Sequence, residues 1–80
     1  MNRKDIYESD QRNVHRELKT EFGVDTGIVP AEFRETLIEI MERAYITSRP
    51  GNMLNSLLRK KLVMKSENKG LLIYYIPKET

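Results

Sequence analysis

The chain has 80 residues, of which 39% are hydrophobic and 32% charged, with a formal net charge of +2. This length suits one domain, residues 1–80, with a modest core, and it excludes a second domain. With no cysteine, the chain has no disulfide, thiolate zinc site or cysteine nucleophile, which suits a reducing, cytoplasmic location. No stretch is apolar for long enough to cross a bilayer, so no membrane partner is expected.

The first predicted element is a helix over residues 10–22. It is indicated by an apolar side chain at every fourth position: Val14, Leu18 and Phe22. Ser9 or Asp10 is placed to cap its start, and Gly23 is expected to end it. The single histidine, His15, lies off this stripe and has no second histidine or cysteine to join it. We therefore expect a solvated side chain there, not a metal ligand or a catalytic base.

A short strand and a second helix are predicted next. Glycine, proline and β-branched residues indicate an extended segment near residues 27–29. The following helix, residues 31–44, has the clearest apolar stripe in the chain: Phe33, Leu37, Ile38, Ile40, Met41 and Ala44. Glu32 and Glu35 near its start and Arg43 near its end suit the helix dipole.

A third helix is predicted over residues 50–61, with Ser48 or Asn52 as its cap. Its apolar side chains point to the core: Met53, Leu54, Leu57 and Leu58. The same spacing places only polar and basic side chains on the other side: Asn52, Asn55, Ser56, Arg59 and Lys60. Because that side has no carboxylate, it suits the base edges and phosphates of a nucleic acid.

The chain is predicted to end in a β-hairpin, with strands near residues 62–66 and 71–76. Gly70 accepts a positive φ, so it is expected to close a short loop against a bulge. The second strand is apolar on both faces, which favours helices on one side and a neighbouring element or a partner on the other. Residues 1–8 and 77–80 are expected to be flexible ends.

Charge is divided unevenly along the chain. Residues 1–47 hold seven Lys and Arg against ten Asp and Glu, whereas residues 48–80 hold seven against two. This asymmetry indicates an acidic partner for the C-terminal part. The alternative is that these cations only solubilise an ordinary surface.

The segment "MLNSLLRKKLVMKSENKGLLIYYIP" resembles the recognition helix and wing of the winged helix-turn-helix DNA-binding superfamily. The resemblance implies a small α+β protein that binds double-stranded DNA to regulate transcription. Its third helix would enter the major groove, and its hairpin would lie on the flanking backbone. The matching DNA-binding positions are Arg49, Asn52, Asn55, Ser56, Arg59, Lys60, Lys65, Asn68 and Lys69.

Two features depart from that pattern. The segment "YITSRPG" between the second and third helices is longer than a tight turn. The second helix also carries four glutamates that phosphates would repel unless they point away: Glu32, Glu35, Glu39 and Glu42.

Other functions are weighed against DNA binding. The sequence contains no glycine-rich phosphate loop and no recognisable set of catalytic residues. We therefore expect a protein without enzymatic activity, cofactor or metal. The alternative function is a winged-helix module for protein–protein contacts, or a small inhibitor or adaptor of a larger complex. A homodimer is possible, because two copies would read two DNA half-sites in place of one. The first helix or the last strand would then form the dimer interface.

Overall fold

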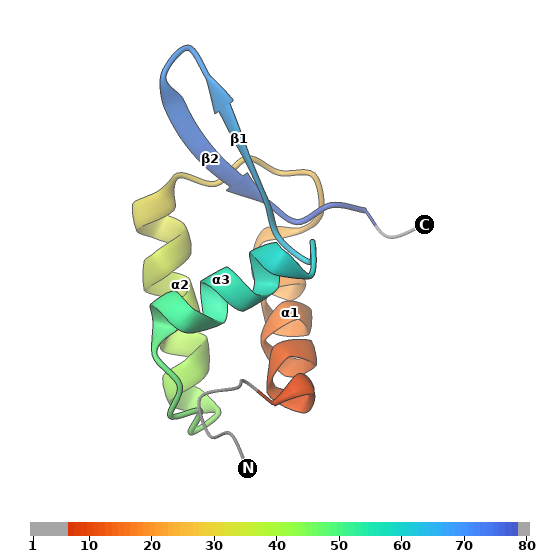
Figure 1. Ribbon diagram of the computed structural model, residues 1–80, viewed down its shortest axis with the longest axis vertical. Helices are drawn as coiled ribbons and strands as arrows, with labels where there is room; N and C mark the ends of the chain where they lie inside the picture. The colour runs from red at the N-terminus through yellow and green to blue at the C-terminus, as the bar shows by residue number, and fades with distance from the viewer. Residues whose placement is uncertain (1–6, 79–80) are drawn as a thin grey trace.

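The computed structural model describes residues 7–78 and shows an α+β domain. Three helices precede a two-stranded antiparallel hairpin: α1 (Glu8–Phe22), α2 (Pro30–Arg43), α3 (Pro50–Arg59), β1 (Met64–Asn68) and β2 (Leu71–Tyr75). The helices form one body, and the hairpin projects from one end of it (Figure 1). The predicted class and element order are confirmed, and they match the layout of a winged helix.

The core draws apolar side chains from every helix and from both segments that flank the hairpin. It consists of Val14, Leu18, Ile28, Phe33, Leu37, Ile40, Met41, Met53, Leu57, Val63 and Ile76. Phe33 of α2 is fully buried in this core, and its ring centroid lies 6.0 Å from that of Phe22 in α1 and 5.1 Å from that of Tyr74 in β2. Aromatic pairs at these distances add to the burial energy, so Phe33 ties the hairpin to both helices.

The hairpin turns through two residues. Its register runs unbroken from Met64 opposite Tyr75 to Asn68 opposite Leu71. Lys69 and Gly70 form the loop with φ of 55° and 80°, the signature of a type I′ turn. The predicted bulge was wrong, and β1 reaches two residues further than predicted because this turn is so short.

The extended segment predicted near residues 27–29 pairs with the hairpin through a single residue. Ile28 and Tyr74 exchange two backbone hydrogen bonds of 2.8 and 2.9 Å. Asp25 also donates its N–H to the carbonyl of Ile76 at 2.8 Å. β2 therefore lies between β1 and the Ile28 segment.

Both predicted helix caps were wrong. α1 begins at Glu8 after Tyr7, and α3 begins at Pro50 after Arg49, with no capping side chain at either described N-cap. Ser9 and Asp10 lie inside the first turn of α1, Ser48 precedes the cap of α3, and Asn52 follows it. Proline at the first position, where the missing N–H has no helical partner to lose, starts both α2 and α3. Glu8, expected to be flexible, is the first residue of α1; residues 1–6 and 79–80 lie outside the described part.

α2 and α3 end in the same way. After α2, the N–H of Ile46 bonds to the carbonyl of Met41 at 2.9 Å, and Tyr45 adopts a φ of 57°. After α3, Leu62 bonds to Leu57 at 2.9 Å, and Lys61 adopts a φ of 62°. These are Schellman motifs, in which the chain turns through a left-handed residue and folds an apolar side chain back onto the helix.

The Schellman motif explains the length of the α2–α3 connection. After α2 ends, the chain turns back so that Ile46 packs against the core, and α3 then starts at Pro50. The connection is long because it includes this buried contact. Ala44, predicted to join the core, is exposed because α2 ends before it.

Candidate nucleic acid interface

Three side chains form an exposed stripe on α3. Asn52, Asn55 and Arg59 are exposed at positions i, i+3 and i+7, whereas Met53 and Leu57 face the core. Burial of the apolar side fixes the direction of the polar side. α3 contains no Asp or Glu, so the stripe offers two amides and one guanidinium to solvent.

Ser56 was predicted to share this stripe, and that prediction was wrong. Its side chain is 1% exposed and forms a hydrogen bond with the side-chain amide of Gln11 in α1. Position 56 lies where α3 meets α1, and serine is small enough to be buried there once its hydroxyl has a partner. Ser56 is therefore a packing residue and is not available to an external ligand.

The start of α3 adds a cation to the stripe. Arg49 is the N-cap, is exposed, and is followed by exposed Asn52 one turn later. The N-cap provides no side-chain acceptor, so the first N–H groups of the described helix remain directed outward. Arg49 and the positive end of the helix dipole lie together at this point.

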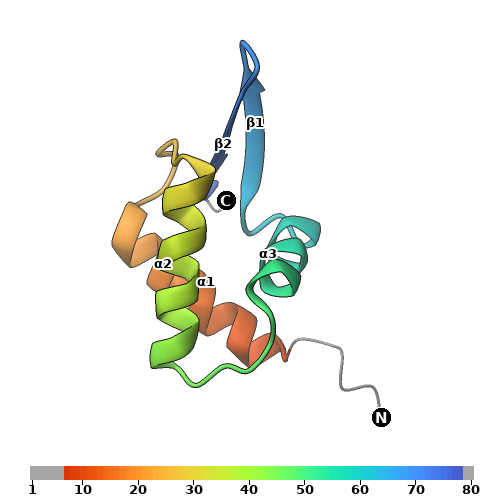
Figure 2. The same cartoon turned by 90° about the vertical axis from the view of Figure 1, so that its left-hand side faces the viewer.

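The hairpin carries the remaining predicted side chains. Lys65, Asn68 and Lys69 are all exposed, and Lys69 stands at the tip in the two-residue loop. α3 and β1 lie on one side of the molecule, and α2 lies on the other (Figure 2). Lys65 and Asn68, at odd and even positions of β1, lie on opposite faces of the hairpin.

The predicted cations differ in their surroundings. The Nζ atom of Lys60 lies 3.5 Å from a carboxylate oxygen of Glu8, so much of its charge is offset. Within residues 7–78, no carboxylate lies within ion-pair distance of Arg49, Arg59 or Lys69. Those three side chains keep their charge available at the surface.

The acidic side of α2 points away from the core. Its exposed glutamates follow a single stripe: Glu32, Glu35, Glu39 and Glu42. This stripe lies on the opposite side of the helix from buried Phe33, Leu37 and Ile40. The glutamates therefore face away from the core, on a helix that lies on the other side of the molecule from α3 (Figure 2).

His15 was predicted to be solvated, and the structure corrects this. The side chain is only 7% exposed and joins Gln11, Val14 and Leu18 on the buried side of α1. The spacing 11, 14, 15, 18 is a regular helical stripe, but two of its members are polar. Apolar spacing alone therefore predicts only Val14 and Leu18 of these four buried residues.

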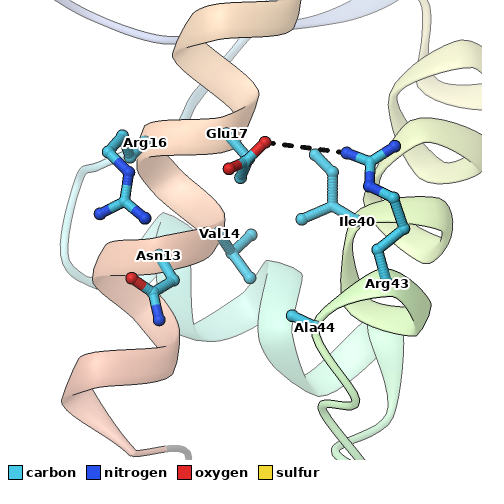
Figure 3. Close-up of a pocket in the computed structure, with 7 residues that line it drawn as sticks. All are labelled: Asn13, Val14, Arg16, Glu17, Ile40, Arg43 and Ala44. Carbon is cyan, nitrogen blue, oxygen red and sulfur yellow. Dashed lines mark ion pairs between the residues drawn. The ribbon is translucent and has the colours of Figure 1, made fainter.

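A hollow lies between α1 and α2, on the side away from α3 (Figure 3). It has a volume of about 220 Å³, and its apolar lining residues are Val14, Ile40 and Ala44. An ion pair of 3.7 Å between Glu17 and Arg43 spans its rim. The hollow contains no nucleophile, and its volume is below the range typical of small-molecule sites.

Across residues 7–78, no three His, Cys, Asp or Glu side chains gather in a way that would hold a metal ion. None of the helices in that part of the chain is long and apolar enough to span a membrane. Comparisons with protein-family models, curated proteins and solved structures found no match.

Proposed function

We propose that this chain is a small intracellular DNA-binding protein of the kind that regulates transcription. α3 would enter the major groove, and the hairpin would lie on the flanking backbone. The observation that carries the proposal is the exposed α3 stripe of Asn52, Asn55 and Arg59, which has no carboxylate among its members. An amide matches the donor and acceptor of adenine, and a guanidinium matches guanine or phosphate.

The other exposed groups have distinct parts in this proposal. Arg49 and the start of α3 would hold one phosphate, and Lys69 with Asn68 at the hairpin tip would hold another. Lys60 and Lys65 are weaker candidates. Lys60 pairs with Glu8, and Lys65 shares its hairpin face with Glu67 two residues later.

The test compares two arginines on a fluorescent duplex, by anisotropy at low salt. Arg59→Ala and Arg34→Ala remove the same charge from exposed positions, the first on α3 and the second on α2. We expect Arg59→Ala to weaken binding about tenfold, because it removes a direct contact, and Arg34→Ala to have little effect. Equal losses from both variants would show that only net charge matters, and the assigned surface would be wrong.

A protein-binding role is the second candidate, and the outer face of the hairpin favours it. Leu71, Ile73 and Tyr75 alternate onto the face away from Phe33, and Leu71 is 70% exposed. Their cross-strand partners Asn68, Ser66 and Met64 are also uncharged. If the chain binds no duplex at low salt, and Leu71→Ser abolishes binding to a defined protein partner, this second function replaces the first.

A further inference from the structure

β1 leaves one backbone edge of the sheet open. Tyr74 directs both its N–H and its carbonyl to Ile28, away from β1. The opposite residue, Lys65, therefore belongs to a pair that is not hydrogen-bonded, and its backbone groups point outward. The same holds for Glu67, two residues later. Residues 65–68 are all exposed, and among the described backbone contacts none outside the hairpin reaches them.

The charges along the β1 edge are complementary to those of a second, antiparallel copy of the same strand. In an antiparallel pair of two β1 strands centred on Ser66, Lys65 of each copy lies opposite Glu67 of the other. Both residues have outward backbone groups, so each such pair also exchanges two hydrogen bonds. Directly opposite side chains lie about 5 Å apart, close enough for the two charges to attract.

Charge also selects this register over its neighbours. Only odd-numbered residues of β1 have outward groups, so the two nearest alternatives shift the centre by one residue, to Lys65 or to Glu67. Centring on Lys65 brings two lysines together. Centring on Glu67 brings two glutamates together and places Lys65 opposite Lys69. Like charges directly opposite are destabilising, which leaves Ser66 as the favoured centre.

We propose that β1 is a self-association edge, through which two copies pair antiparallel about Ser66 with reciprocal contacts between Lys65 and Glu67. A lone lysine on an edge strand opposes such pairing, because it would meet a second charge of its own kind or none. Here Glu67 of the second copy lies opposite Lys65, so the lysine meets an opposite charge and favours the pairing. The α3 stripe lies outside the paired segment, so the dimer carries two copies of it, whereas Lys65 and Asn68 lie within the pairing.

The first experiment uses a cysteine at the proposed twofold axis. The chain has no native cysteine, so Ser66→Cys introduces a single thiol. In the paired dimer the two residues at position 66 form a non-hydrogen-bonded pair with Cα atoms about 4.5 Å apart, which a disulfide spans. We expect Ser66→Cys to cross-link under mild oxidation and Asn68→Cys, which faces Met64 of the second copy, to cross-link far less. Equal or absent cross-linking in both would overturn the proposal.

The second experiment exchanges the charges and measures mass by sedimentation equilibrium, with circular dichroism to check folding. We expect wild type to dimerise, and Lys65→Glu and Glu67→Lys each to weaken dimerisation by about tenfold or more, since each creates like-charge pairs. The double exchange should dimerise like wild type. The two single variants should also associate when mixed, because each then meets the opposite charge.

A wild-type chain that stays monomeric at about 1 mM, well above the range of weak protein complexes, would overturn the pairing. So would a double exchange or a mixture that fails to restore it while both singles remain folded. No DNA is present in either experiment, so these results leave the DNA-binding proposal to its own test.

Discussion

Gln11 and Ser56 place two polar side chains in the interface between α1 and α3. Both are nearly inaccessible to solvent, and they hydrogen-bond to each other across 45 positions of sequence. The Oε1 atom of Gln11 has no hydrogen-bond partner among the described atoms. The pair is therefore only partly satisfied, and its buried amide depends on the serine hydroxyl.

Removing that hydroxyl is predicted to destabilise the fold. Ser56→Ala leaves the amide of Gln11 buried with no partner, which costs about 1–3 kcal/mol. Urea unfolding followed by circular dichroism measures this loss. Asn55→Ala, next to it but exposed, is the matched control and should change the free energy of unfolding by less than about 0.5 kcal/mol.

A second substitution separates a lost hydrogen bond from lost packing. Gln11→Met in the Ser56→Ala background replaces the orphaned amide with an apolar chain of similar length, so much of the stability should return. If the double variant is no more stable than Ser56→Ala alone, the hydroxyl does not act through Gln11.

Ser56 and His15, both predicted to be exposed, mark where residue-level prediction failed. Sequence patterns assign polar side chains to solvent, because burial without a partner is costly. The partner of Ser56 lies on another helix, so its presence depends on how α1 crosses α3. No periodicity within α3 contains that information.

At the scale of the elements, α2 and α3 end on unusual residues. The left-handed position of a Schellman motif is commonly glycine, because a side chain there meets the following carbonyl. Here the two positions hold Tyr45 and Lys61, with φ of 57° and 62°. Tyr45 is also 90% exposed, so burial of its ring does not offset the strain.

Glycine at either position is therefore predicted to stabilise the domain. Tyr45→Gly and Lys61→Gly each remove a left-handed strain of about 1–2 kcal/mol from the folded state. Each also raises the conformational entropy of the unfolded chain, so the free energy of unfolding should rise by only about 0.5–1 kcal/mol. Thermal unfolding measures the change. Alanine keeps the Cβ atom, so Tyr45→Ala and Lys61→Ala should show no such gain. A loss of stability in Tyr45→Gly would mean that its side chain makes a contact that supports the fold.

Element-level prediction succeeded where the signal is local. Apolar spacing, Gly23 and the prolines that start α2 and α3 located all three helices, because each signal depends on neighbours within one or two turns. The hairpin loop was harder. Lys69 adopts its positive φ because a two-residue turn matches the twist of the strands, and that preference overrides the residue type. The cap predicted for α3 is absent because that helix starts at proline, and the cap predicted for α1 is absent because the helix begins before Ser9 and Asp10.

At the scale of the whole molecule, the charges separate by element. Exposed glutamates line the outer face of α2, whereas Arg49, Arg59 and Lys69 belong to α3, its N-cap and the hairpin, and α2 and α3 lie on different sides of the molecule (Figure 2). The sequence predicted this division through its charge asymmetry, but it could not show that the fold turns the two groups in different directions. Packing of Phe33, Leu37 and Ile40 sets that direction for α2.

This separation predicts how salt affects DNA binding. Affinity for a duplex falls with salt in proportion to the number of phosphates contacted, because each contact releases counterions. Arg59→Ala should reduce the slope of log affinity against log salt by up to about one if it contacts phosphate. Glu35→Gln combined with Glu39→Gln removes two charges from the far side, so it should raise affinity slightly at low salt and leave the slope unchanged. Anisotropy titrations over a salt series distinguish these cases. A steeper slope in the glutamine variant would place α2 beside the phosphates and would contradict the orientation assigned to α3.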